Sequence, residues 1–539
     1  MLVYGDHEEL LDPAEALNTL REDDGRWLDH DALRNRFIML SGLAQGVADA
    51  DFAEHGSDRE RAAERALLQQ LVALGAALLQ SWDQGCSGGI APALPAVSGL
   101  PAAVRVREGE GYAHYALYPE AYGLAARQLK LAAPPLVIGL RSIGSGLAAV
   151  AAAALGAPAP VTLRPGGDPF ARSLSIDPRL AAHLLEGERH FVLVDEGPGL
   201  SGSSFGCVAD WLEDHGVPAE RIAFLPGHGG DLGPQASPRH RERWQTAQRP
   251  VVQPDRLHGW ISTLVGTITN WSDLSGGAWR PMWNASEAAW PPVVPAWERM
   301  KFLVDTDSGQ WLVRFAGLGS AGRQILALAT QLAEYGFGPE VGGLTHGWLV
   351  LRWHSDAVQT RPSASEVQAY LALRSRLPGP AGAILGDLVT MVRRNLPEFA
   401  GWDPDLRRLA PEPVQVDGRL HAHEWLRLPD GRLLKADALD HHRSHDLVGC
   451  QDIAWDQAGA VVELGMPLPS AKPNLEAFYR VAYCAFQIGA CTLGKGMSPA
   501  AEHPRLDAAI ARYRLALVDA VEHLRDVDQA LSRGIEAFA

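Results

Sequence analysis

Cysteine is scarce in this chain of 539 residues, and long apolar runs are missing. The five cysteines are scattered without a C-x-x-C pair, which argues against a disulfide framework and against a cysteine zinc site. No stretch approaches the roughly 18 consecutive apolar residues of a membrane span. The acidic beginning, MLVYGDHEELLD, lacks the pattern of a signal peptide. We therefore expect a cytoplasmic protein without a membrane partner.

Runs of basic residues are missing as well. The net charge is −16, and no segment is rich in lysine or arginine, so a protein that tracks a nucleic-acid duplex is disfavoured. Neither a Gly-x-Ser-x-Gly elbow nor a Gly-x-x-x-x-Gly-Lys-Ser/Thr phosphate loop occurs. The expected partner is a small-molecule substrate, and a homo-oligomer is left open.

Composition predicts an α/β multidomain protein. The length suggests about three domains at the usual ~100–200 residues each. We expect a helical N-terminal region over residues 1–88, because apolar residues recur there at helical spacing. An α/β domain over 89–250 and a second folded domain over 297–539 are joined by a connection at 251–296 that is rich in Pro, Gly and Trp.

The most informative segment is FVLVDEGPGLSGSSF, residues 191–205. Its first four residues predict a buried strand, and the acids Asp195 and Glu196 follow at the carboxyl end. A loop of small residues and a helix come next, an order that directs backbone N–H groups and hydroxyls toward a phosphate. An ordinary glycine-rich strand–turn–helix junction is the alternative. The loop residues expected to bind the phosphate are Gly199, Leu200, Ser201, Gly202, Ser203 and Ser204.

This segment resembles the phosphoribosyl-diphosphate (PRPP) motif of type I phosphoribosyltransferases. The resemblance implies that Asp195 and Glu196 hold ribose hydroxyls or Mg²⁺ and take part in catalysis. The loop is one residue longer than the usual form, and Glu196 stands where a second aspartate is common. Upstream, a second predicted strand at 135–139 leads into a loop that the resemblance assigns to pyrophosphate, made of Arg141, Ser142, Ile143 and Gly144.

Two further parts of such a site lie nearby. The resemblance implies a basic loop that closes over PRPP, for which Arg164, also a catalytic candidate, and Arg172 are available. Tyr112, Tyr115 and Tyr118 are candidates for the acceptor pocket, although we favour a half-buried strand face for them. Strands alternating with helices predict a parallel sheet, and ligands of such sheets bind at the carboxyl ends of the strands.

The second half begins with a different pattern. A hairpin is predicted over 301–315, a helix over 322–335 and a strand over 346–353. This order resembles the N-lobe of the aminoglycoside-phosphotransferase branch of the protein-kinase-like fold, a two-lobed α+β fold. Arg314 would stand near the position of the nucleotide-binding lysine, a departure that matters because lysine and arginine are not interchangeable at a phosphate site.

A resemblance to the catalytic loop of the same family follows in LHAHEWL (420–426) and PDGRLLKAD (429–437). It places Glu424 where the family has a metal-binding asparagine and Asp437 at the second metal aspartate. The base position falls on Arg419, which cannot accept a proton near neutral pH. Alternative bases are Asp417, which also belongs to the expected nucleotide site, His421 and His423.

Two segments accompany this loop. CQDIAWDQA (450–458) resembles the structural D-x-x-x-D helix start of the family. The polar cluster over 440–446 holds His441 and His445 at i and i+4, a spacing suited to a metal, although we favour a polar loop with hydrogen-bonded histidines.

The main functional prediction is a PRPP- or phosphoribosyl-nucleotide-using phosphoribosyltransferase with a fused, atypical kinase-like domain. Its implied cofactor is Mg²⁺, at Asp195, Glu196 and Asp437, with ATP as a second cofactor of the kinase-like half. One alternative is a regulatory or scaffold protein that senses a phosphoribosyl ligand and carries a pseudokinase-like half. The other is an ATP-dependent small-molecule phosphotransferase.

Overall fold

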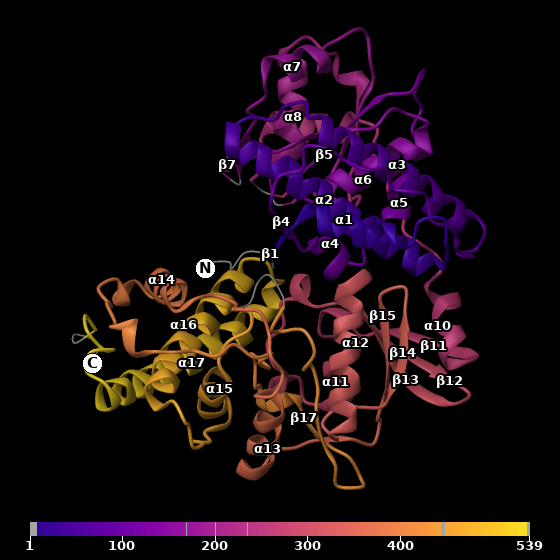
Figure 1. Cartoon of the computed structure of the whole chain (residues 1–539). Helices are drawn as coiled ribbons and strands as arrows, with labels where there is room; N and C mark the ends of the chain where they lie inside the picture. The colour runs from indigo at the N-terminus through magenta and orange to yellow at the C-terminus, as the bar shows by residue number, and fades with distance from the viewer. Residues whose placement is uncertain (1–7, 169, 200, 234, 444–447, 536–539) are drawn as a thin grey trace. The chain divides into compact units, whose positions relative to one another are not determined.

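The computed structural model describes residues 8–168, 170–199, 201–233, 235–443 and 448–535 (Figure 1). It divides into two compact units. The N-terminal unit holds residues 8–257 and Gly317–Ala321, and the C-terminal unit holds the described residues of His258–Ala316 and Gly322–Ala539. Each unit has its own sheet, so the chain is a mixed α/β protein.

A four-stranded parallel sheet forms the centre of the N-terminal unit. Its strands are β5 (Leu136–Leu140), β6 (Val161–Leu163), β9 (Phe191–Val194) and β10 (Ile222–Leu225), in the order β10-β9-β5-β6. All residues of β5, β9 and β10 are buried, as continuous apolar runs predict for strands covered on both faces. The predicted parallel sheet is confirmed, and the loops after its strands meet at one edge.

Helices surround this sheet. They are α1 (Pro13–Arg21), α2 (His30–His55), α3 (Ala62–Asp83), α4 (Glu110–Ala113), α5 (Pro119–Ala126), α6 (Gly144–Leu155), α7 (Pro178–Leu184), α8 (Ser203–Asp214) and α9 (Pro238–Thr246). Helix α3 packs on α2 and α6, so the helical N-terminal region and the sheet share one unit. By length and composition α3 is apolar enough to cross a membrane, but it is largely buried against these helices, as a core helix is.

Short strands complete this unit. They pair as β1 (Glu8–Leu11) with β4 (Val104–Arg107), β2 (Trp27–Leu28) with β3 (Gly89–Ile90), and β7 (Gly166–Asp168) with β8 (Ala171–Ser173). The strand favoured for Tyr112, Tyr115 and Tyr118 is wrong: Tyr112 lies in α4 and the other two in the loop before α5. Tyr112 and Tyr118 are buried whereas Tyr115 is exposed, so the three tyrosines do not share one buried face.

A five-stranded antiparallel sheet opens the C-terminal unit. Its strands are β11 (Ile268–Asp273), β12 (Lys301–Thr306), β13 (Gly309–Phe315), β14 (Val341–Thr345) and β15 (Trp348–Arg352), in the order β11-β12-β13-β15-β14. The hairpin expected over 301–315 is confirmed as β12 and β13, and α12 (Gly319–Glu334) covers the helix expected at 322–335. The segment 251–296 also contains regular structure: α10 (Leu257–Val265), β11 and α11 (Arg280–Trp283). Strand β11, ITNWSD, is largely polar because it lies at the sheet edge, which hid it from pattern analysis.

Helices form the rest of this unit (yellow and orange in Figure 1). They are α13 (Ala364–Arg374), α14 (Leu385–Asn395), α15 (Ala454–Leu464), α16 (Pro473–Lys495) and α17 (His503–Val527). A core that includes the buried aromatic residues Trp402, Trp455, Phe478 and Tyr479 joins α14, α15, α16 and α17. A small sheet of β16 (Val358–Gln359), β17 (Trp425–Arg427) and β18 (Leu433–Lys435) carries the residues described next.

Candidate functional site

Asp437 stands two residues beyond β18, in a left-handed backbone conformation with φ 48°. This region is unfavourable for residues other than glycine and is common at functional sites, where neighbouring contacts hold the strain. Its carboxylate is 49% exposed, whereas the nearby Asp440 and His441 are buried. An accessible carboxylate therefore lies at the end of a rigid hairpin.

Arg314 joins the sheet of the C-terminal unit to this carboxylate. From β13 its guanidinium lies 3.6 Å from Asp437 and donates a 2.9 Å hydrogen bond to Asp440. Arg299 also donates to Asp440, and His441 Nε2 lies 3.4 Å from Asp437. Although desolvation alone would raise the pKa of Asp437, the charges of His441 and Arg314 hold it well below its usual range. The carboxylate is therefore ionised near neutral pH.

The loop that begins at Asp417 lies beneath this cluster. Asp456 of α15 accepts hydrogen bonds from the backbone N–H groups of Asp417 (2.7 Å) and Gly418 (2.9 Å). Trp455 donates its indole N–H to the Gly418 carbonyl, at 3.2 Å. Burial, followed by the charge of Asp417, raises the pKa of Asp456 to about 7. The helix start over 452–456 thus fixes the position of the loop.

Asp417 itself is fully buried, which argues against the alternative that it acts as a base on an external substrate. Its carboxylate accepts a hydrogen bond from Tyr370 and lies 3.2 Å from Lys435 Nζ and 3.7 Å from Arg374. Burial would raise the pKa of Asp417, but the charge of Lys435 lowers it below its usual range. Arg419, by contrast, is partly exposed, and its buried Nε is among the described atoms without a hydrogen-bond partner.

Glu424 and Asp437 belong to two different clusters, whereas the resemblance implied a shared metal. The carboxylate of Asp437 groups with Asp440 and His441, with ligand atoms within 4.8 Å of one another. Glu424 groups with His421 and His423 in the same way and accepts a 2.6 Å hydrogen bond from Lys435. His445, the i+4 partner predicted for His441, lies outside the described residues.

Pattern analysis missed Lys435 and the pairing partner Arg299. A signal for Lys435 was present, because it lies within the segment 429–437 that was singled out for Asp437. No comparable signal existed for Arg299, whose partner Asp440 is 141 residues away in the sequence.

In the N-terminal unit the predicted acids lie where β9 ends. Glu196 accepts a hydrogen bond from the Gly111 backbone N–H (3.0 Å), and Asp195 accepts one from the Glu196 N–H (2.8 Å). Burial and the charge of Glu196 raise the pKa of Asp195 to about 8. Helix α8 begins directly after the loop, where Gly199 and Gly202 have positive φ. The side chain of Ser201 accepts from the Ser203 N–H at 3.2 Å; Leu200 lies outside the described residues.

The two loops predicted to bind PRPP are neighbours. A Cβ at Gly144 would lie 2.8 Å from the Val194 carbonyl oxygen and 3.7 Å from the Asp195 Cα. Helix α6 starts at Gly144, directly after Ser142 and Ile143. Only glycine permits this approach, so the backbones of the two loops share one edge of the sheet.

Arg141 and Arg164 pair with carboxylates of the same unit, which differs from the ligand-binding role predicted for them. Arg141 is buried, donates to Asp58 and Thr162, and lies 2.9 Å from Asp49. Arg164 forms an ion pair with Asp49 as well. These guanidinium groups tie the helical N-terminal region to the sheet, so side-chain binding of pyrophosphate would require breaking buried ion pairs. No sequence pattern indicates the pairing with Asp49 and Asp58, because these aspartates lie 83 or more residues away from the arginines.

Arg172 of β8 is a basic side chain whose charge acts on the pKa of Asp195. Its charge lowers the pKa values of both Asp195 and Cys207, against the upward effect of burial. Its NH1 donates a 3.5 Å hydrogen bond to the Pro165 carbonyl. Of the basic residues named from the sequence for the PRPP-binding loops, Arg172 is the one whose charge acts on Asp195.

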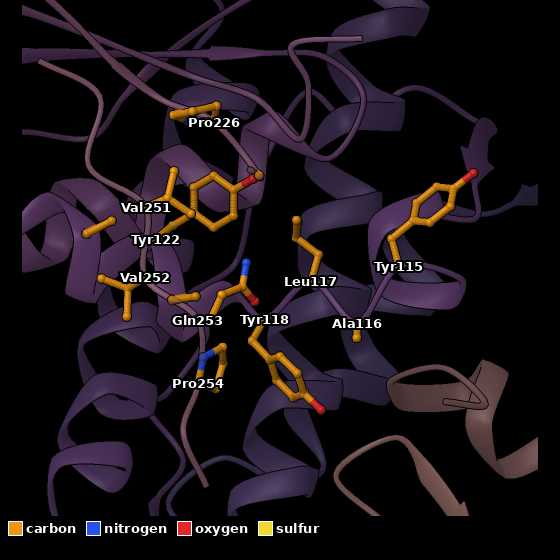
Figure 2. A pocket seen from close by; sticks show the side chains of 13 residues that line it. Tyr115, Ala116, Leu117, Tyr118, Tyr122, Pro226, Val251, Val252, Gln253 and Pro254 are labelled. Carbon is orange, nitrogen blue, oxygen red and sulfur yellow. The ribbon is translucent and has the colours of Figure 1, made fainter. Parts of the chain in front are cut away.

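A small pocket of about 40 Å³ borders the acid loop (Figure 2). Tyr115, Tyr118 and Tyr122 line it together with Gly227, whose N–H donates to the carbonyls of Glu196 (3.2 Å) and Gly197 (3.0 Å). Two of the tyrosines proposed for an acceptor pocket thus line a real cavity. Its volume suits water rather than a nucleobase.

No protein-family model and no curated protein matches this sequence. Among solved structures, a choline kinase, LicA from Streptococcus pneumoniae, is 14% identical over 47% of this chain and 96% of its own, with a TM-score of 0.31. A choline/ethanolamine kinase family protein from Mesorhizobium loti is 16% identical over 44% of this chain and 90% of its own (TM-score 0.24). An ethanolamine kinase from Plasmodium vivax is 8% identical over 40% and 79% (TM-score 0.25). TM-scores this low carry no argument about fold or activity.

Proposed function

We propose that the C-terminal unit is a kinase-like module that acts as an ATP-dependent small-molecule phosphotransferase. The observation that carries this proposal is the meeting of Arg314, from the antiparallel sheet, with the exposed carboxylate of Asp437 at the end of a separate hairpin. Phosphoryl transfer depends mainly on positioning and on neutralising negative charge. A cation and an acidic metal ligand side by side supply both.

The residues present fit Mg²⁺ at Asp437. Its carboxylate is exposed and ionised, and Mg²⁺ prefers oxygen ligands while keeping several waters and phosphate oxygens. When bound, Mg²⁺ would neutralise the phosphates of ATP. Arg314 holds this segment through its hydrogen bond to Asp440 and adds a positive charge 3.6 Å from Asp437, where it would offset the charge of a nearby phosphate. Arg419 at the base position adds a permanent positive charge but accepts no proton, so we expect slow turnover.

Calorimetry on the full chain tests this proposal. ATP should bind in the presence of Mg²⁺, and ADP release should depend on an added small alcohol, with choline and ethanolamine among those tried. Asp437→Asn should remove the Mg²⁺-dependent binding. Asp430→Asn, on the exposed turn of the same hairpin, should leave it unchanged. Equal ATP binding with and without metal would reduce Asp437 to a turn residue.

A second candidate function, PRPP binding in the N-terminal unit, is favoured by the close approach of Gly144 to Val194 and Asp195. Two phosphate-type loops, the start of α8 and Arg172 gather there, at the edge of a parallel sheet where ligands bind. Here Asp195 and Glu196 would hold ribose hydroxyls or Mg²⁺. PRPP with Mg²⁺ should bind the full chain, and the double variant Asp195→Asn/Glu196→Gln should not.

Pyrophosphate release separates the remaining alternatives. Release that depends on the acid pair indicates a phosphoribosyltransferase. Binding of PRPP without release of pyrophosphate or ADP indicates the regulatory or scaffold protein. No binding of PRPP removes this second function and leaves the phosphotransferase proposal untouched.

A further inference from the structure

A cluster of two histidines and a carboxylate lies apart from the Asp437 cluster. His421, His423 and Glu424 come from one short segment, the 3-10 helix Ala422–Glu424 and the residue before it. Their ligand atoms lie within 4.8 Å of one another. The two imidazole rings are stacked, with centroids 5.2 Å apart and planes inclined by 21°. Both rings therefore face the same side of the loop.

The two oxygens of Glu424 are divided between different partners. Oε2 accepts a hydrogen bond from Lys435 Nζ at 2.6 Å, while Oε1 lies 3.2 Å from His421 Nδ1 and 3.9 Å from His423 Nε2. A tetrahedral Zn²⁺ with bonds of about 2.0–2.1 Å needs ligand atoms roughly 3.3–3.4 Å apart. The distance from Glu424 to His421 (3.2 Å) is close to this value, and the distance from Glu424 to His423 (3.9 Å) would have to shorten when an ion binds.

Neighbouring groups contact both histidines. The opposite nitrogen of His421, Nε2, lies 4.0 Å from Glu463 Oε1, so a second carboxylate is close to this ring but beyond hydrogen-bond distance. The ring of Trp279 stacks on His423, with centroids 5.9 Å apart, and so restricts the orientation of this imidazole.

We infer that His421, His423 and Glu424 form a binding site for a divalent transition-metal ion of the Zn²⁺ class, with one position open to solvent. Two nitrogens and one oxygen suit Zn²⁺ and Co²⁺ and do not suit Mg²⁺. The side chains of His421 and His423 are 20% and 27% exposed, so an ion can reach them. The site is independent of the phosphotransferase proposal, whose carboxylates belong to another cluster.

Co²⁺ is the probe for the test, in a buffer that contains excess Mg²⁺. Chelator-treated full-length protein should bind Co²⁺ with the intense visible absorption of a tetrahedral complex, and Zn²⁺ should displace it. X-ray absorption of the loaded wild type should show two imidazole ligands. His421→Ala and His423→Ala should each weaken binding by at least about tenfold, since changes even in groups that orient metal ligands cost 10–100-fold.

The matched control is His55→Ala, because Asp51, Glu54 and His55 form another cluster of suitable spacing in the chain. Asp51 of that cluster is already paired with Arg61, so we expect no effect on Co²⁺ binding. Three outcomes would each overturn the inference. They are loss of the Co²⁺ absorption in His55→Ala, absence of a tetrahedral Co²⁺ spectrum in the wild type, and fewer than two imidazole ligands in the wild-type X-ray absorption spectrum. The wild-type spectrum decides the matter even if a variant fails to fold.

Discussion

Lys435 lies between two buried carboxylates, 2.6 Å from Glu424 Oε2 and 3.2 Å from Asp417 Oδ2. Burial alone would lower the pKa of this lysine, but the charges of Asp417 and Glu424 raise it, so the ammonium stays protonated. It binds both ends of the segment 417–424 to strand β18. Asp417 and Glu424, at either end of the loop that resembles a kinase catalytic loop, are therefore held in place by the buried ammonium of Lys435.

The first prediction concerns this lysine. Lys435→Met should destabilise the C-terminal unit by about 3–5 kcal/mol, because removing one partner leaves buried charge uncompensated. Denaturant unfolding followed by tryptophan fluorescence measures the change, since Trp425 lies beside the ammonium. The double variant Lys435→Met/Glu424→Gln should recover part of the loss. A single variant as stable as wild type would show that the ion pairs contribute little.

Arg419 permits a gain-of-function prediction. If its position is that of a missing catalytic base, Arg419→Asp should raise Mg²⁺-dependent ADP release by roughly 10–100-fold, near the low end of what a positioned base supplies. Arg419→Met, which removes the charge without adding a base, is the control. An unchanged rate in Arg419→Asp would indicate that this position is not that of a catalytic base.

Glu64 should make the stability of the N-terminal unit depend on pH. Burial raises its pKa to about 7 from 4.5, although Arg141 and the Thr162 hydroxyl oppose the shift. Below pH 4.5 the carboxyl is protonated in both states. As pH rises toward 7 the unfolded chain ionises first, so stability falls until the folded carboxyl also ionises.

Glu64→Gln removes this titration. Relative to wild type, the variant should gain up to about 3 kcal/mol of stability between pH 4 and pH 8, the equivalent of the pKa shift at 1.36 kcal/mol per unit. Thermal unfolding at the two pH values measures it. A constant difference between the two proteins would contradict the prediction.

Loss of Arg141 should reduce the stability of the N-terminal unit, whereas loss of Arg172 should reduce its affinity for PRPP. Arg141→Met should destabilise the N-terminal unit by about 3–5 kcal/mol, because Asp58 and Asp49 lose their partner. Arg172→Ala should leave stability within about 1 kcal/mol, as is typical away from buried networks, and weaken PRPP binding. Calorimetry and thermal unfolding of both variants separate the two roles. Normal PRPP affinity in Arg172→Ala would remove this arginine from the candidate site.

Local sequence determined the central strands, the 301–315 hairpin and the order of the loops, whereas the polar edge strand β11 and the segment of Tyr112 to Tyr118 escaped it. Continuous apolar runs at 136–140 and 191–194 specified buried parallel strands, and the acids with their glycine loop were correctly placed at the sheet edge. The hairpin over 301–315 and the helix after it followed from alternation and helical spacing in the same way. These features depend on residues within a few positions of one another, so the sequence alone determines them.

Only the tertiary structure decided which charges pair. Arg141 was expected to meet a ligand, yet α2 and the segment after it bring Asp49 and Asp58 to it. The resemblance places Glu424 at a metal-ligand position of the kinase-like fold, yet Lys435 and two histidines are the groups that lie beside its carboxylate. A charged side chain pairs with whichever opposite charge the packing of distant elements brings near, because burying it alone is too costly. That choice depends on contacts across dozens of residues, which no local pattern records.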